Sequence, residues 1–213
     1  MKKLNNKKVV VFDFDGTIVD SMESFAQIAA QVMPKHYEID AKTAYEKYIL
    51  TSGLPFFEQL ETLFPGNSAN PQASLEFETI KKQSYTQKRV FADADETLKT
   101  LQAKNIKVVV SSNNFQELVD DFVKQAEISF DLVLGYRVNF AKGADHFKYI
   151  LQEVGCTHEE ITFVGDSLKD ADKASMFGID FIGKTGTFST DDFKKHKPGV
   201  KVITTLAELK EMF

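Results

Sequence analysis

An apolar, β-branched run that begins at Val9 and ends in the carboxylates Asp13 and Asp15 constrains the fold of this chain most. A continuous apolar run of this length is typical of a parallel strand that is buried on both faces. Gly16 and Thr17 then interrupt the pattern where a central strand would leave its sheet. Open α/β sheets bind ligands at the carboxyl ends of their strands, so the sequence predicts two acids at a binding edge.

Asp13 and Asp15 lie two positions apart, and strand alternation would send their side chains to opposite sides unless the chain already turns there. In either case one carboxylate can attack a substrate while the other transfers a proton. An acidic turn without a chemical role is the alternative interpretation of a bare Asp-x-Asp pair.

Residues 13–17 resemble DxDGT, the first motif of the haloacid dehalogenase superfamily of phosphohydrolases. The resemblance implies that Asp13 is the nucleophile and Asp15 the general acid and base. A carboxylate nucleophile divides phosphate hydrolysis into two steps, and both steps need a proton transfer. The dehalogenase and phosphonatase branches lack an aspartate at the position of Asp15. The resemblance therefore favours cleavage of a C–O–P ester.

A second candidate segment is VVVSSNN at residues 108–114, which places Ser112 and Asn113 just after a predicted strand. It resembles the second motif of the family, a Ser or Thr at a strand end, and the resemblance favours Ser112. A hydroxyl and backbone N–H groups at this position can donate to phosphoryl oxygens. Two alternatives stay open: Ser111 provides the hydroxyl, or the segment is only a helix N-cap.

Lys142 resembles the third motif, a lysine close to the start of a helix, which is predicted here from about Ala144. A cation at this position lowers the repulsion between a phosphate and the aspartates, and it keeps the nucleophile ionised. Relatives often have a proline one or two residues after this lysine, whereas Gly143 and Ala144 follow here. Arg137 is the alternative cation, and a solvated Lys142 without a role is the other alternative.

The segment at residues 161–170 places Asp166 after an apolar strand and Asp170 at the start of the next helix. It resembles GDxxxD, the fourth motif, and its spacing brings both acids to one face of a helix. Together with Asp13 and Asp15, four carboxylates would then converge. Each close pair would repel by about 4 kcal/mol at an effective dielectric constant of about 20, so the group needs a compensating cation.

A divalent cation relieves this repulsion, and ligands that are all oxygen favour Mg²⁺ over zinc or iron. The resemblance implies that Asp13 and Asp166 bind Mg²⁺ through carboxylates and that Asp15 binds it through its backbone carbonyl. Asp170 would bind directly or through water. The four histidines are scattered along the chain and form no competing cluster.

Beyond the first motif, apolar residues recur at helical spacing, and no convincing strand is predicted between residues 22 and 89. From Val90 onward, predicted strands alternate with predicted helices, which is typical of an α/β domain. A polar loop is expected at 184–198. The strands of this part are expected at 106–110, 131–135, 160–164, 179–182 and 201–203.

This pattern predicts a doubly wound, Rossmann-like parallel sheet with an inserted all-helical cap domain. The core domain is expected to comprise residues 1–17 and 90–213, and the cap domain residues 18–89. At 213 residues, with 43% hydrophobic and 27% charged residues, the chain is long enough for one domain with an insertion.

The net charge of −5 and the lack of a long basic stripe argue against a nucleic-acid partner. No segment reaches the roughly 20 apolar residues that a membrane span needs, and the start does not resemble a signal peptide. Cys156 is the only cysteine, so no internal disulfide is possible. We therefore expect a cytoplasmic protein, either a monomer or a homodimer, without a membrane partner.

The resemblance implies Mg²⁺-dependent hydrolysis of a small phosphorylated metabolite through an aspartyl-phosphate. Within the family, the chain resembles the branch that has a helical, C1-type cap, which includes phosphoglycolate phosphatase and β-phosphoglucomutase. The cap is expected to close over the site and exclude water. The candidate substrate contacts in it are Met22, Thr51, Ser52, Gly53 and Leu54.

Several alternatives to this function stay open. A phosphomutase of the β-phosphoglucomutase type is the nearest, because it shares the architecture. A non-catalytic relative whose cap binds a partner protein is the second. A response-regulator receiver also combines clustered acids with Ser or Thr and Lys, but it lacks the long helical insertion and GDxxxD. Arg89 and Arg137 are the only arginines, which disfavours a substrate with a second anionic group.

Overall fold

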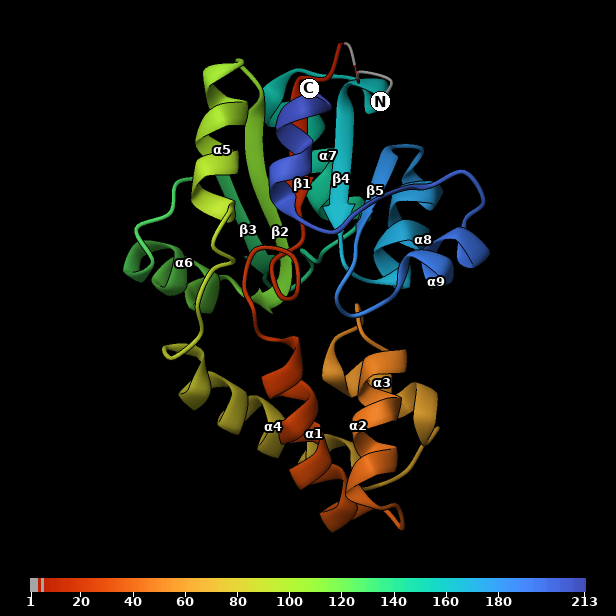
Figure 1. Ribbon diagram of the computed structural model, residues 1–213. Coiled ribbons are helices and arrows are strands. Elements are labelled where there is room, and N and C mark those ends of the chain that lie inside the picture. Colours follow the sequence, from red (N-terminus) through yellow and green to blue (C-terminus); the bar gives the residue numbers. More distant parts are fainter. Residues whose placement is uncertain (1–3, 5) are drawn as a thin grey trace. The chain divides into compact units, whose positions relative to one another are not determined.

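In the computed structural model, which describes residues 4 and 6–213, the chain forms two compact units. The first unit comprises the described residues up to Val19 together with Val90–Phe213, and the second comprises Asp20–Arg89. Figure 1 shows the elements of each unit, coloured along the sequence. Of the helices in the described residues, none has the length and apolarity that a membrane span requires.

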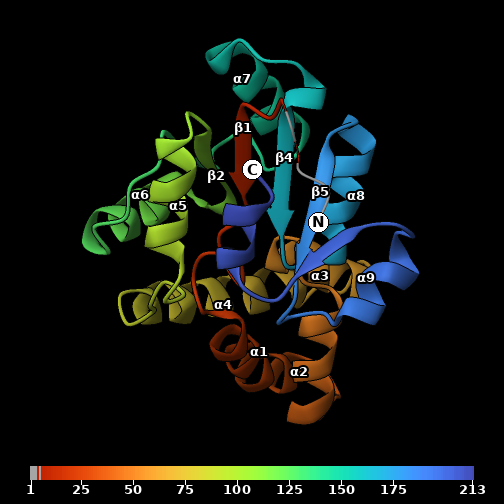
Figure 2. The same ribbon diagram turned by 45° about the horizontal axis from the view of Figure 1, so that its top comes forward.

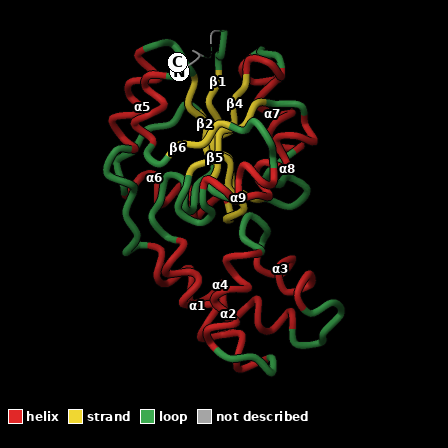
Figure 3. Tube along the Cα trace, turned by 45° about the vertical axis from the view of Figure 1, so that its right-hand side comes forward, coloured by secondary structure: helices red, strands yellow, loops and turns green. Residues whose placement is uncertain are grey.

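The first unit is built on a six-stranded sheet in which every neighbouring pair is parallel and the order is β3-β2-β1-β4-β5-β6. Strand β1 is central, with β2 and β4 as its neighbours, and helices lie on both sides of the sheet (Figure 3). They are β1 (Val9–Phe12), β2 (Lys107–Phe115), β3 (Leu132–Tyr136), β4 (Ile161–Gly165), β5 (Asp180–Lys184) and β6 (Lys201–Ile203).

The sheet has its topological switch point at β1. The chain first builds β2 and β3 on one side of this strand, and then β4, β5 and β6 on the other. All four residues of β1 are fully buried, because the strand has a neighbour on each side and helices over both faces. The predicted α/β fold with a doubly wound parallel sheet is confirmed, and its ligand edge is the carboxyl end of β1.

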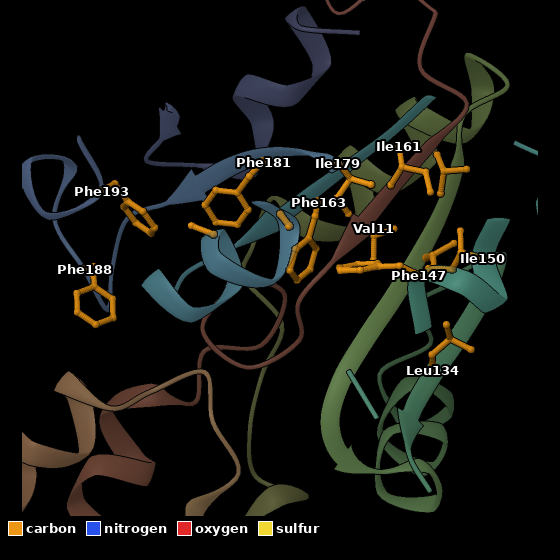
Figure 4. Packing of buried hydrophobic residues seen from close by; sticks show 14 residues of the cluster. Val11, Leu134, Phe147, Ile150, Ile161, Phe163, Ile179, Phe181, Phe188 and Phe193 are labelled. Carbon is orange, nitrogen blue, oxygen red and sulfur yellow. The ribbon is translucent and has the colours of Figure 1, made fainter. Parts of the chain in front are cut away.

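Helices α7 and α8 cover one face of this sheet, where Phe147 of α7 packs against Phe163 of β4 with ring centroids 5.3 Å apart (Figure 4). The opposite face carries α5 and the short 3₁₀ helix η2 (Figure 2). The helical segments of this unit are α5 (Ala94–Ala103), α6 (Gln116–Gln125), α7 (Ala144–Val154), η1 (His158–Glu160), α8 (Leu168–Phe177), α9 (Thr190–His196) and η2 (Leu206–Glu211).

The second unit is helical throughout, as the sequence predicts, and residues 20–89 contain no strand. Its core is aromatic: Phe56 stacks on Phe77 at 3.9 Å between ring centroids, and Tyr37 stacks on Phe64 at the same distance. The helices are α1 (Met22–His36), α2 (Ala41–Leu50), α3 (Phe56–Leu63) and α4 (Asn70–Tyr85).

Two elements differ from the prediction. Strand β2 continues to Phe115 instead of ending near residue 110, because its pairing with β3 resumes at Tyr136 after a register shift. Ser112 and Asn113 therefore lie in the irregular last part of the strand and not after it. The polar stretch at 184–198 is not only a loop, since Ser189 caps a short helix by accepting a hydrogen bond from the Asp192 N–H.

Candidate active site

The site begins where β1 ends, because the chain turns directly after Asp13. The Asp13 N–H still donates to the Val164 carbonyl at 2.8 Å, which continues the pairing with β4. Gly16 then takes a left-handed φ of +79°, and its N–H donates to the Val19 carbonyl at 2.8 Å. The chain is therefore already turning at Asp15, and strand alternation does not decide where the two acidic side chains lie.

Lys142 lies at the centre of the acidic residues. Its Nζ is 2.5 Å from Oδ1 of Asp13 and 2.6 Å from Oδ1 of Asp170, and its side chain is only 2% exposed. Oδ2 of Asp13 accepts a hydrogen bond from the Thr17 hydroxyl at 3.2 Å. The ammonium thus joins the first motif to the fourth, so that Lys142, and not Arg137, is the cation beside the aspartates.

Asp166 and Asp170 follow β4, and the start of α8 fixes their positions. Ser167 caps this helix: its hydroxyl accepts a hydrogen bond from the Asp170 N–H at 3.1 Å and donates to Oδ2 of Asp170 at 2.7 Å. Gly165 leaves room for this carboxylate, because a Cβ there would lie 2.7 Å from Oδ2 of Asp170. The Thr187 hydroxyl donates to Asp166.

Three of these carboxylates form one buried cluster. Ligand oxygens of Asp13, Asp166 and Asp170 lie within 4.8 Å of one another. Burial raises the pKa of Asp13 to about 6 although Lys142 opposes the shift, and burial together with the charges of Asp13 and Asp170 raises the pKa of Asp166. The charges of Asp13 and Asp170 outweigh burial and raise the pKa of Lys142.

The cluster also has more negative charge than one ammonium compensates. Three buried acids face a single Lys142, so the ionised cluster has a net negative charge. Burial is the main cause of the raised pKa values, and this repulsion adds to the shift because protonation relieves part of it. A divalent cation would relieve it as well, and a donor set made only of carboxylate oxygens fits a hard metal ion.

Asp15 is not part of this cluster and has a different partner. Its Oδ2 accepts a hydrogen bond from Nδ2 of Asn114 at 2.6 Å, and its side chain is half-buried. The Asn114 N–H donates to the Ser112 hydroxyl oxygen at 3.0 Å. The end of β2 therefore links the predicted general acid to the predicted phosphate-binding hydroxyl through Asn114.

The remaining predicted residues of the first unit lie around this centre. Ser111 is fully buried, and its hydroxyl is hydrogen-bonded at 2.8 Å to Nδ1 of His146, so it is engaged in the core of the unit. Asn113 is half-buried in β2. Arg137 lies over the ring of Phe140, 4.5 Å from its centroid.

Four residues that hold the acids were not predicted from the sequence. Thr17 and Ser167 lie inside the first and fourth motifs, so their position beside the predicted aspartates could have indicated them. Asn114 belongs to the SSNN segment, in which the sequence indicates Ser112 and Asn113 and leaves Ser111 as an alternative. Thr187 lies in the polar stretch at 184–198, and nothing in its local sequence indicates a contact with Asp166.

In the second unit, the predicted contact residues at positions 51–54 form a turn that hydrogen bonds with Gln59 hold in place. The Thr51 hydroxyl is hydrogen-bonded to Oε1 of Gln59 at 2.8 Å, and Nε2 of Gln59 donates to the Leu54 carbonyl at 3.0 Å. Gly53 takes a φ of +88°, which this turn requires. Ser52 is buried, and Met22 is the first residue of α1.

Comparison with known proteins agrees with the four motifs. The family model of haloacid dehalogenase-like hydrolases matches residues 10–184, a span that contains every acid of the cluster, Asp15 and Lys142. Among curated proteins, the phosphoglycolate phosphatase of Pseudomonas putida is 22% identical over 194 residues. That alignment covers 84% of this chain and 69% of the relative.

Two solved structures have the same fold over nearly the whole chain. A haloacid dehalogenase-like family hydrolase from Streptococcus pneumoniae has a TM-score of 0.78 at 21% identity, covering 96% of this chain and 97% of its own. A hydrolase of the same family from Deinococcus radiodurans, with bound phosphate and sodium, has a TM-score of 0.68 at 19% identity. It covers 96% of this chain and 93% of its own.

Proposed function

This chain belongs to the family of haloacid dehalogenase-like hydrolases, and from that membership we propose that it is a phosphatase that hydrolyses small phosphomonoesters through an aspartyl-phosphate. The observation that carries the proposal is the buried ammonium of Lys142 between Asp13 and Asp170. It keeps a carboxylate ionised inside the protein, at the carboxyl end of the central strand, where a nucleophile for phosphate would be needed.

In the first step, a carboxylate oxygen of Asp13 attacks phosphorus and the bond from phosphorus to the ester oxygen breaks. The carboxyl group of Asp15 gives its proton to the leaving oxygen. Lys142, the Ser112 hydroxyl and backbone N–H groups near Asn113 compensate the charge on the other phosphoryl oxygens. The leaving group departs as an alcohol, and the phosphoryl group stays on Asp13.

In the second step, water replaces the aspartate on phosphorus. Asp15, now ionised, takes a proton from the water as its oxygen attacks, and the bond between Asp13 and phosphorus breaks. Inorganic phosphate leaves and both aspartates return to their starting states. The hydrogen bond from Asn114 to Asp15 supports this double role, since it holds the carboxyl group in one orientation.

We propose Mg²⁺ as the cofactor, held by the carboxylates of Asp13, Asp166 and Asp170, directly or through water, and by the backbone carbonyl of Asp15. The clustered carboxylate oxygens and their excess of negative charge over the single Lys142 ammonium support this assignment. When bound, the ion supplies positive charge against the phosphoryl oxygens. Thr187 would orient Asp166, and Ser167 would orient Asp170.

We further propose that the helical unit at residues 20–89 is the cap, with the domain boundaries near those predicted, and that its turn at 51–54 contacts the leaving group. The name of the Pseudomonas putida relative and the phosphate in the Deinococcus radiodurans structure support a small phosphorylated substrate. The net charge of −5 supports a function without nucleic acid. A cytoplasmic monomer or homodimer is part of the same proposal.

The test is phosphate release from a panel of small phosphomonoesters, measured with Mg²⁺ and with a chelator. The panel should include sugar phosphates and 2-phosphoglycolate. The latter carries a second anionic group, and the low number of arginines disfavours such a substrate, so the comparison tests that expectation. We expect release that depends on the metal and is absent in Asp13→Asn, a variant whose circular dichroism should match the native protein. Full activity of Asp13→Asn would refute the proposal, and transfer of phosphate within the substrate instead of its release would indicate a mutase.

A further inference from the structure

A buried lysine that belongs to none of the four motifs lies beside the turn that contains Asp15. Lys184 is the last residue of β5 and is only 4% exposed. Its Nζ donates to the Gly16 carbonyl at 3.1 Å, and it lies 3.8 Å from the centroid of the Phe91 ring. We infer that Lys184 positions Asp15 as the general acid, an inference that rests on the proposed function.

The contacts of Lys184 fix the backbone that immediately follows Asp15. Gly16 is the next residue, and its carbonyl accepts the hydrogen bond from the ammonium. The Gly16 N–H donates to the Val19 carbonyl at 2.8 Å, so a second hydrogen bond holds the same residue. A shift of the Gly16 carbonyl would therefore change where the side chain of Asp15 points.

The same ammonium also holds the segment by which the chain re-enters the first unit. Phe91, whose ring lies under Nζ, donates its N–H to the Ile18 carbonyl at 2.9 Å. Val19 and Val90 form an isolated antiparallel bridge next to this bond. Lys184 thus contacts the outgoing turn directly and, through Phe91, the returning segment that pairs with it.

Charge and burial make this contact strong. A carbonyl dipole and the face of an aromatic ring both attract a cation, and the attraction increases where water is excluded. An uncharged side chain of the same length would fill the space but would leave the Gly16 carbonyl without this donor. The role therefore requires the ammonium group and not only the volume of the side chain.

Asp15 is held from two strands of the sheet. Asn114 at the end of β2 donates to its carboxylate at 2.6 Å, and Lys184 at the end of β5 fixes the adjacent backbone. These strands lie on opposite sides of β1 in the sheet order. The two contacts together restrict both the side chain and the main chain of the general acid, which proton transfer at a defined atom requires.

Such a role predicts a specific kinetic signature. An ester with a poor leaving group, such as glycerol phosphate, needs a proton from Asp15 as its bond to phosphorus breaks. An ester with a good leaving group, such as p-nitrophenyl phosphate, departs as a stable anion and needs the proton much less. A displaced Asp15 should therefore slow the hydrolysis of glycerol phosphate far more than the hydrolysis of p-nitrophenyl phosphate.

The experiment compares kcat/KM for these two esters in the native protein, Lys184→Met and Asn114→Ala. We expect Lys184→Met to lower kcat/KM for glycerol phosphate by about 10-fold or more, and for p-nitrophenyl phosphate by less than about 3-fold. Asn114→Ala, which acts on the same carboxyl group, should give the same signature. Equal losses for the two esters in Lys184→Met, or no loss in either, would overturn the inference.

Lys7→Met is the matched control for loss of a buried lysine. The Lys7 side chain is 5% exposed, and its Nζ lies 2.7 Å from Asp180 at the opposite end of β5. Its loss should lower the melting temperature without changing the ratio of the two kcat/KM values. If Lys184→Met does not fold, Phe91→Leu is the second variant, because it removes the ring beneath Nζ. It should change the ratio of the two kcat/KM values in the same direction as Lys184→Met. An unchanged ratio in Phe91→Leu would overturn the inference. A native protein that hydrolyses no ester would refute the proposed function itself.

Discussion

The ammonium of Lys142 lies 2.5 Å from Oδ1 of Asp13 and thereby joins two segments that are 129 residues apart in the sequence. The same Nζ lies 2.6 Å from Asp170, so one cation compensates two buried carboxylates. The contact has consequences for stability as well as for catalysis, because an unpaired carboxylate inside a protein is costly.

Replacing Lys142 by methionine should therefore destabilise the metal-free protein. Removing one partner of a buried ion pair typically costs about 3–5 kcal/mol, since the remaining charge is left uncompensated. We expect a loss of this size in the free energy of unfolding, measured by urea denaturation in chelator. Activity with Mg²⁺ should fall by about 100-fold or more. A loss of less than about 1 kcal/mol would show that water already compensates the two aspartates.

Mg²⁺ should raise the melting temperature of the native protein. An ion that binds only the folded state stabilises it by about 2.7 kcal/mol at 100 times its dissociation constant. For a protein of this size, each kcal/mol corresponds to a shift of about 2–4 °C. We expect a rise of about 5–10 °C in thermal melts, and no rise for Asp166→Asn, which removes one ligand.

Sodium at equal ionic strength is the control for this titration, because it screens surface charges without binding as a divalent ion. An equal rise with sodium, or with Mg²⁺ in Asp166→Asn, would contradict a metal site formed by the three aspartates.

Gly165→Ala should weaken the same site through crowding alone. A Cβ at this position would lie 2.7 Å from Oδ2 of Asp170 and 2.8 Å from its Cβ, so the carboxylate must move away from Lys142 and Ser167. We expect a stability loss of about 1–3 kcal/mol together with an approximately 10-fold weaker affinity for Mg²⁺, measured by calorimetry.

Gly183→Ala is the matched control for this crowding. A Cβ at this position would lie 2.9 Å from the ring of Phe193, and its three nearest atoms all belong to that ring. It should lose stability but keep the native affinity for Mg²⁺. If both variants bind Mg²⁺ as the native protein does, Asp170 is not a ligand whose position matters.

The sheet and its ligand edge could be predicted because their signals are local. An apolar run that ends in Asp13 predicts a buried strand, and parallel strands bring their carboxyl ends to one edge. Once the fold is known, residues such as Lys142 and Asp170 must approach Asp13, whatever their distance in the sequence. The three acids of the cluster were all among the predicted metal ligands.

The contacts that orient these acids could not be predicted from the sequence, because they depend on the register of distant strands and on irregular loops. Thr187 reaches Asp166 from a polar stretch that has no periodicity, and Lys184 reaches the Gly16 carbonyl across 168 residues. The continuation of β2 to Phe115 depends on a register shift, which only the pairing with β3 reveals. A one-dimensional pattern carries none of this information.

His146 should make the stability of the protein depend on pH in a predictable direction. It is fully buried beside Ser111, and burial, together with the charge of Lys142, lowers its pKa from 6.5 to about 4. The unfolded chain takes up a proton below about pH 6.5, whereas the folded protein does so only near pH 4. The neutral buried His146 therefore costs no stability above about pH 6.5, and the free energy of unfolding decreases progressively as the pH falls from about 6.5 to about 4.

The test compares the native protein with His146→Asn, which keeps a polar group near the position of Nδ1 but does not titrate. Between about pH 7 and about pH 4.5, the native protein should lose about 2 kcal/mol more stability than the variant, measured by urea denaturation in chelator. The acids of the cluster titrate in both proteins, so their contribution cancels in the difference. His158→Asn, at an exposed histidine, should follow the native curve. Parallel curves for the native protein and His146→Asn would mean that His146 already carries its proton in the folded state.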